Sequence, residues 1–239
     1  TLTIENGSFV GNISAVYVHE GKLYVNGGEY SIKQKTNGEG EEPYRFTLNC
    51  YDASREAGEA TITVIGGTFD HFNPANNAAE GAHTNFLAEG YTVYLENGKY
   101  IVANATVATL SEMVTAMQNG YSKVVLGADL SYNGMISFSH DVTLDLNGHT
   151  LRSANSNALG AVNGATLTIN GNGNVNAQEV CVLVLDGSKA IINGGTYTTV
   201  DNFVLGTNGT AGRGGNTITV NGGTFNGNIT TSEIGRASC

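Results

Sequence analysis

The segment DVTLDLNGHTLR, residues 141–152, brings acidic, imidazole and guanidinium side chains close together in the sequence. Polysaccharide hydrolases need paired carboxylates, and calcium-dependent lyases need an acidic cluster with a base. The candidate residues for such chemistry are Asp141, Asp145, His149 and Arg152. Side-chain alternation turns the apolar residues of this strand to one face and Asp145 with Asn147 to the other, while His149 follows the turn. We therefore predict hydrogen-bonding roles for these residues and no catalytic site.

The remaining acidic residues and histidines show no spacing that favours a metal or a cofactor. Five further aspartates fall in loops or at strand ends, and the histidines lack metal-ligand spacing. The segment GTAGRGG, residues 209–215, is glycine-rich but lacks the strand-to-helix context of a phosphate-binding loop. We predict no metal ion and no cofactor.

Exposed rings and two acidic loops are the remaining candidates for ligand binding. The chain has no Trp and 11 Tyr, so stacking on a sugar would fall to tyrosine. The tyrosines that we expect to be exposed are Tyr24, Tyr44, Tyr51, Tyr94 and Tyr132. The loops NGEGEEP (37–43) and DASREAGE (52–59) interrupt the repeat, and such insertions often gather on a binding face. The candidate binding residues are Tyr44, Tyr51, Glu41, Glu42 and Asp52; the alternative is that both loops are simply solvated.

A repeat positions all of these residues. The segment TITVNGGTFNGN (217–228) closely resembles TITVIGGTFDHF (61–72), and shorter copies recur along the chain. A period of about 20 to 30 residues indicates a solenoid, and alternating residues indicate that its units are strands. The turn and ladder residues are Asn6, Gly7, Gly28, Gly67, Asn147, Gly148, Asn170, Asn193, Gly195, Asn221 and Gly223, of which we expect the asparagines to form a ladder of side-chain amides. The aromatic residues that follow the turns, Phe9, Tyr30, Phe69, Tyr197 and Phe225, are expected to stack inside, as are aliphatic residues such as Ile218 and Val220.

The repeat stops between Phe69 and Thr143. The segment YTVYLENGKYIV (91–102) predicts a hairpin that covers the end of a solenoid. The following segment, TLSEMVTAMQNG (109–120), has the apolar spacing of a helix with a capping box. We predict the C-terminal part of a first solenoid at 1–103, and a capping helix with the N-terminal part of a second at 104–232.

We expect the chain to be a fragment whose last residues are a non-native tail or, alternatively, a true short loop. The first residue lies inside a repeat, so we expect the chain to be a fragment. The segment EIGRASC (233–239) breaks the repeat and matches one reading frame of a common sequencing adapter, so we expect a non-native tail.

Composition excludes some classes of partner. The formal net charge is −10 with only 11 Lys plus Arg, and no basic run is present to pair with nucleic acid or an anionic membrane. No apolar run reaches the length of a membrane span, so membrane insertion is not expected. The 3 Cys are widely spaced and predict neither a disulfide nor a zinc site.

The capping helix, the segment VVLGADL and the segment VTLDLNGHTL together resemble the opening of right-handed parallel β-helix domains of the pectin-lyase-like class. Such domains occur in large bacterial surface proteins and in some phage tail proteins. The resemblance implies an all-β fold, a right-handed parallel β-helix with two partial solenoids in tandem and one short capping helix.

The function implied is a non-catalytic structural or adhesive module, extracellular or on the cell surface, that binds glycan or a host surface protein. One alternative is a fragment of a polysaccharide lyase or glycoside hydrolase whose active site lies elsewhere. The other is a phage tail or receptor-binding protein, located in the virion.

Overall fold

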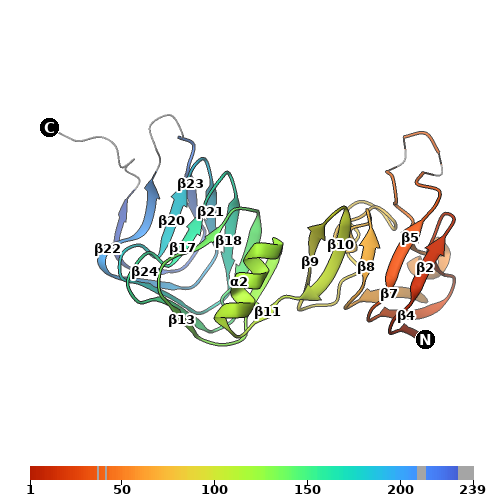
Figure 1. The fold of residues 1–239 in the computed structure, drawn as a ribbon, viewed down its shortest axis with the longest axis horizontal. Coiled ribbons are helices and arrows are strands. Elements are labelled where there is room, and N and C mark those ends of the chain that lie inside the picture. The colour runs from red at the N-terminus through yellow and green to blue at the C-terminus, as the bar shows by residue number, and fades with distance from the viewer. Residues whose placement is uncertain (37, 41, 209–213, 231–239) are drawn as a thin grey trace. The chain divides into compact units, whose positions relative to one another are not determined.

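The computed structural model describes residues 1–36, 38–40, 42–208 and 214–230. The chain divides into two compact units, Thr1–Asn104 and Ala105–Cys239 (Figure 1). In each unit parallel strands of successive coils stack in register, so the predicted all-β solenoid is confirmed. Glu41, residues 209–213 of the glycine-rich segment and the segment 233–239 lie outside the described residues.

The first unit is coloured red to yellow-green in Figure 1. Its strands form the sheets β1-β4-β7, β2-β5-β8-β10-β9 and β3-β6. The elements are β1 (Leu2–Ile4), β2 (Ser8–Gly11), β3 (Val16–Val18), β4 (Gly21–Val25), β5 (Glu29–Ile32), β6 (Leu48–Cys50), α1 (Asp52–Glu56), β7 (Ala60–Val64), β8 (Thr68–Asp70), β9 (Tyr91–Glu96) and β10 (Lys99–Asn104). Because strands of successive coils pair within the same sheet, residues from neighbouring coils meet in columns.

An aromatic column runs through the core of the first unit. The rings of Phe9 and Tyr30 stack at 5.1 Å, and those of Tyr30 and Phe69 stack at 4.8 Å. The column then continues into Phe72, which lies 6.0 Å from Phe69. Tyr30 also donates its hydroxyl hydrogen to the Gly27 carbonyl at 2.7 Å, which satisfies the polar end of a buried ring. The predicted stacking of these three rings is confirmed.

The double glycine of the repeated corner has two separate causes. At the first glycine, coils approach too closely for a side chain: a Cβ on Gly66 would lie 2.1 Å from the Asn26 carbonyl oxygen, and one on Gly27 2.4 Å from that of Glu5. At the second, Gly67 has a φ of 108°, which L-residues with side chains rarely adopt. Stacking therefore fixes the first glycine, and the turn conformation fixes the second.

The first solenoid is closed by the predicted hairpin. Strand β10 pairs antiparallel with β8, and β9 pairs antiparallel with β10. The loop between β8 and β9 also continues the first sheet, because Val64 N donates to the Phe86 carbonyl at 2.8 Å. Phe86 packs in the same core cluster. The edge strand is thereby covered, which limits pairing with other chains.

The second unit, green to blue in Figure 1, repeats this arrangement. Strands β11-β12-β15-β18-β21-β23 form one sheet, and the long strand β22 joins the stacks β13-β16-β19 and β14-β17-β20, with β24 beside it. The elements are β11 (Thr106–Val107), α2 (Leu110–Asn119), β12 (Lys123–Leu126), β13 (Leu130–Tyr132), β14 (Ile136–Phe138), β15 (Val142–Asp145), β16 (Thr150–Ser153), β17 (Leu159–Ala161), β18 (Thr166–Asn170), β19 (Asn174–Ala177), β20 (Val182–Leu185), β21 (Lys189–Ile192), β22 (Thr196–Asn208), β23 (Thr217–Val220) and β24 (Thr224–Thr230).

The core of the second unit is mostly aliphatic. Leu144, Ile169 and Ile192 are paired in register and fully buried. The predicted stack of Tyr197 on Phe225 is confirmed at 5.1 Å. The expectation that Val220 is buried is wrong: it is 46% exposed, because β23 is the last strand of its sheet within the described residues.

The helix α2 is present as predicted. Thr109 Oγ1 accepts from Glu112 N at 3.2 Å, while Glu112 Oε2 accepts from Thr109 N at 3.0 Å, which completes the capping box. Met113 of this helix is buried in the core of the second unit. The expectation of a single helix is wrong, because DASREAGE (52–59) contains α1 instead of being only a loop.

Candidate functional site

The two aspartates of DVTLDLNGHTLR each bind a different backbone N–H group. Asp141 Oδ1 accepts from Thr166 N at 2.7 Å in the next coil. Asp145 Oδ1 accepts from Asn147 N at 2.9 Å and thereby holds the corner. These carboxylates are hydrogen-bond acceptors for the backbone, which is the structural role that the sequence predicts.

His149 and Arg152 do not complete a catalytic group with these carboxylates. His149 Nδ1 lies 3.3 Å from Asp129 Oδ1, and the same oxygen accepts from Thr150 N at 2.9 Å. Arg152 lies exposed on β16. Within the described ranges, no group of three or more His, Cys, Asp or Glu residues could hold a metal ion.

The side-chain amide ladder occupies one column of the second unit. Asn193 Nδ2 donates to Asn170 Oδ1, and Asn221 Nδ2 donates to Asn193 Oδ1, both at 2.7 Å. The residue in register with Asn170 is Asp145. The placement of Asn147 in this ladder is therefore wrong: its Nδ2 donates to the Leu126 carbonyl at 2.9 Å.

At the corresponding corner of the first unit, an asparagine side chain binds a glutamate instead of another asparagine. Asn26 Nδ2 donates to Glu5 Oε1 at 3.0 Å. Asn6 instead accepts from its own neighbour, Gly7 N, at 2.8 Å, so it stands outside the column. The remaining glycines from the sequence prediction all have positive φ, as corners require: Gly7, Gly28, Gly67, Gly148, Gly195 and Gly223.

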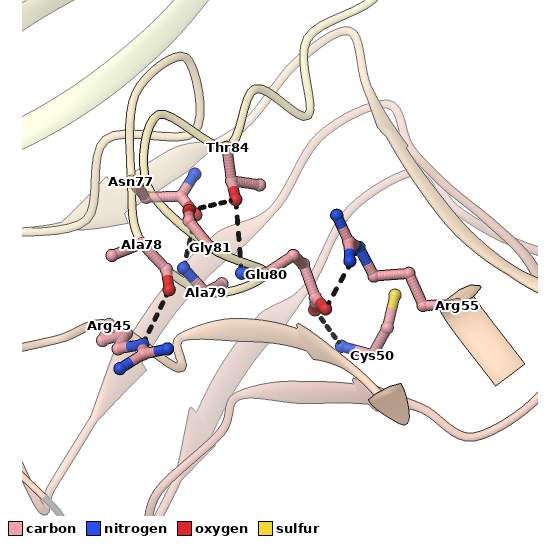
Figure 2. Close-up of polar contacts among 9 residues, drawn as sticks. All are labelled: Arg45, Cys50, Arg55, Asn77, Ala78, Ala79, Glu80, Gly81 and Thr84. Atoms are coloured by element: carbon pink, nitrogen blue, oxygen red, sulfur yellow. Dashed lines mark hydrogen bonds and ion pairs between the residues drawn. The ribbon is translucent and has the colours of Figure 1, made fainter. Parts of the chain in front are cut away.

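A buried carboxylate clamps the closing loop of the first unit to its last coils (Figure 2). The Glu80 side chain is 1% exposed; its Oε1 accepts from Cys50 N at 2.6 Å, and its Oε2 lies 3.3 Å from Arg55 Nε. A second anchor is the bond from Arg45 Nε to the Ala78 carbonyl at 2.6 Å. Glu80 has no sequence signal, because its partners lie 25 and 30 residues away on α1 and β6.

We expect the substitution Glu80→Ala to destabilise the first unit by about 1–3 kcal/mol, since it leaves the Cys50 N–H without its acceptor. Glu89, an exposed acidic residue in the same loop, is the matched control, and Glu89→Ala should change stability by less than about 0.5 kcal/mol. Urea unfolding of the three proteins measures this difference. Equal unfolding midpoints for both variants would show that the clamp contributes nothing.

The candidate binding residues of the two loops are separated. Tyr44 is half-buried and its ring stacks on His71 at 4.7 Å, with Lys35 Nζ 5.6 Å from its centroid. Glu42 is exposed. Tyr51 and Asp52 lie together at the start of α1, and both are exposed.

Exposure of the expected tyrosines varies. Tyr24 is 37% exposed and Tyr51 is 42% exposed. Tyr94 is less exposed than either, because its side chain is half-buried. The expectation for Tyr132 is wrong: it is buried in the core and donates its hydroxyl hydrogen to the Ala158 carbonyl at 2.9 Å. Tyr132 can be buried because the Ala158 carbonyl inside the coil satisfies its hydroxyl group.

The structure instead exposes a group of rings that we call the aromatic patch: Tyr17, His19 and Tyr51, with Asp52 beside them. Tyr17 is 50% exposed, and the rings of His19 and Tyr51 stack at 4.7 Å with an interplanar angle of 8°. Partial desolvation, and then the negative charge of Asp52, raise the pKa of the Tyr17 hydroxyl. The sequence did contain a signal for Tyr17 and His19, since alternation in VYVHE turns Val16 and Val18 to the other face.

The two described cysteines are free and buried, one in each unit. Burial raises the pKa of the Cys50 thiol to about 11 and that of Cys181 to about 12. Both thiols therefore stay protonated in the folded protein at a pH at which an unfolded thiol, with a pKa of about 8.5, ionises.

In a Cys239→Ser background, we expect a thiol-reactive reagent near pH 8 to label the native chain only through unfolding, but to label both cysteines at once in urea. Because both folded pKa values are raised, the stability that these thiols contribute is complete below about pH 8.5 and is lost as the pH rises towards 11 to 12. Mass spectrometry of the labelled peptides reports each unit separately. Rapid stoichiometric labelling of native protein would contradict the burial of both thiols.

None of the described helices has the length and apolar character needed to cross a membrane. No family model, curated protein or solved structure matches the chain.

Proposed function

We propose that the chain is a non-catalytic structural and adhesive β-solenoid module of an extracellular surface protein, which displays side chains for binding to glycan. One observation carries this proposal. The best candidates for chemistry, Asp141 and Asp145, hold backbone N–H groups of the coils, whereas the rings of Tyr17 and Tyr51 are left open to solvent. These two aspartates thus support the coil geometry, whereas the two exposed rings are available to a ligand.

The architecture supports a role in display. Coils that stack at about 4.8 Å form a rigid support, and each adds loops to the same edges. The repeat and the resemblance of its opening segments to pectin-lyase-like β-helix domains favour a surface protein as the parent. The low content of charged residues, 13%, also fits a scaffold with a Thr- and Asn-rich exterior.

A second candidate function, hydrolysis of a polysaccharide, has one observation in its favour. A groove of 270 Å³ on the β2-β5-β8-β10 sheet is lined by Glu29 and Asp70, with Lys99 beside them. Two carboxylates that face one groove are the minimum for glycoside hydrolysis. Lys99 is in register with Asp70 on the neighbouring strand.

Incubation of the chain with a panel of neutral and acidic polysaccharides distinguishes these functions. The proposal expects retention on at least one immobilised polysaccharide and no new reducing or unsaturated ends. New ends that disappear in Glu29→Gln or Asp70→Asn would instead establish the enzyme. A stable trimer in light scattering would favour the phage tail protein.

A further inference from the structure

We propose that the aromatic patch of the first unit binds a neutral pyranose sugar, with Tyr17 as the stacking platform. This inference rests on the proposed glycan-binding function and names the site and the class of ligand. It goes beyond the sequence prediction, which included Tyr51 and Asp52 but neither Tyr17 nor His19.

The first argument is the geometry of the rings. Tyr17 lies on β3, in register with Asn49 of β6, and its ring is half-exposed although the neighbouring Val18 is buried. His19 stacks against Tyr51 of the next coil, which restrains both rings. An aromatic ring has a negative face, and the C–H groups of one pyranose face are apolar with slightly positive hydrogens. The restrained rings of His19 and Tyr51 therefore bind such a face at a low cost in side-chain entropy, and the exposed ring of Tyr17 extends the same patch.

The second argument is the space beside these rings. A groove of 370 Å³ adjoins the patch and is lined by Tyr17, His19, Glu20 and Lys22. This volume lies within the range of about 300–1,000 Å³ that is usual for sites of small ligands. The carboxylate of Glu20 accepts hydrogen bonds and the ammonium group of Lys22 donates them, which matches sugar hydroxyl groups.

The third argument is charge. Asp52 lies close enough to Tyr17 to perturb its hydroxyl, and Glu20 lines the groove. Lys22 and the first residue, Thr1, with its α-amino group, line the same groove, so the preference rests on the net charge of −10 that the whole chain carries. Like charges across an interface are unfavourable, so a uronic acid is disfavoured and a neutral sugar is preferred.

The test is titration calorimetry of the full chain with neutral hexasaccharides of glucose, xylose and mannose, and with oligogalacturonate. We expect binding of a neutral probe, weakened about tenfold in Tyr17→Ala and in Tyr51→Ala. Tyr17→Phe keeps the ring and should retain most of the affinity. Tyr24→Ala is the matched control, because Tyr24 is an exposed tyrosine on β4 outside the groove lining. Circular dichroism melting of each variant verifies that the fold is intact.

Each outcome decides one claim. Loss of binding in the two alanine variants, with retention in Tyr24→Ala, supports the aromatic patch. Binding of a neutral sugar that Tyr17→Ala leaves unchanged overturns the patch but leaves the proposed function standing. Binding of oligogalacturonate alone overturns the charge argument, and the absence of binding to every probe overturns both the inference and glycan binding as the proposed function.

Discussion

Replacement of Phe69 by alanine is expected to unfold much of the first unit, with a loss of about 3–5 kcal/mol in the free energy of unfolding. Phe69 is fully buried and its ring contacts both Tyr30 and Phe72, so the cavity would interrupt the aromatic column between the coils and the closing loop. The cost is large because rings above and below cannot move together while the strands hold their register.

Phe225 provides the control for this prediction. It also stacks on a neighbouring tyrosine, but it is half-buried and belongs to the last coil that the structure describes in the second unit. Phe225→Ala should therefore cost clearly less than Phe69→Ala in urea unfolding. An equal cost would show that the position of a ring within the column does not determine its contribution.

The second large effect is expected for Gly66→Ala. The added Cβ would lie 2.1 Å from the carbonyl oxygen of Asn26, a backbone atom of the coil below that cannot move without breaking the stack. Ile65 N and Gly66 N both donate to the Val25 carbonyl, so a shift of this corner also strains the backbone hydrogen bonds between the two coils. We expect a loss of several kcal/mol, or failure of the first unit to fold.

Gly90→Ala separates this steric effect from backbone conformation. Gly90 has a φ of 82°, but a Cβ there would meet no atom within 4 Å. Its substitution should cost only the strain of a left-handed residue, about 1–2 kcal/mol. Thermal melting of both variants measures the difference, and a Gly66→Ala protein as stable as Gly90→Ala would contradict the close approach of the coils.

The sequence predicts those features that depend on periodicity. Alternation in TITV and the recurrent NGG corner are sufficient to predict stacked strands and buried rings, and the segment YTVYLENGKYIV is sufficient to predict the closing hairpin. Periodicity does not determine register to a single residue, so the sequence alone places Asn147 in the column that Asp145 occupies in the structure. A shift of one residue along a strand exchanges the two faces of the strand. A shift of two residues keeps the face but moves a side chain from the end of the strand into the corner.

The features that the sequence does not predict depend on contacts between distant residues. Tyr132 is buried because a carbonyl 26 residues away accepts its hydroxyl hydrogen. Glu80 acquires its partners only when the closing loop lies against α1 and β6. Side-chain alternation is enough to predict that Tyr17 and His19 are exposed. Their position next to Tyr51 depends on how the next coil stacks, which the sequence alone does not give.

The most direct test of the stacked-coil arrangement is a set of methyl nuclear Overhauser effects in a selectively labelled sample. The register places Leu144 beside Ile169, and Ile169 beside Ile192, in consecutive coils about 4.8 Å apart. We predict strong cross-peaks for both pairs and a weak or absent one between Leu144 and Ile192. Cross-peaks that join these residues to hairpin neighbours in the sequence, without the two pairs above, would contradict the solenoid and with it the placement of every exposed side chain.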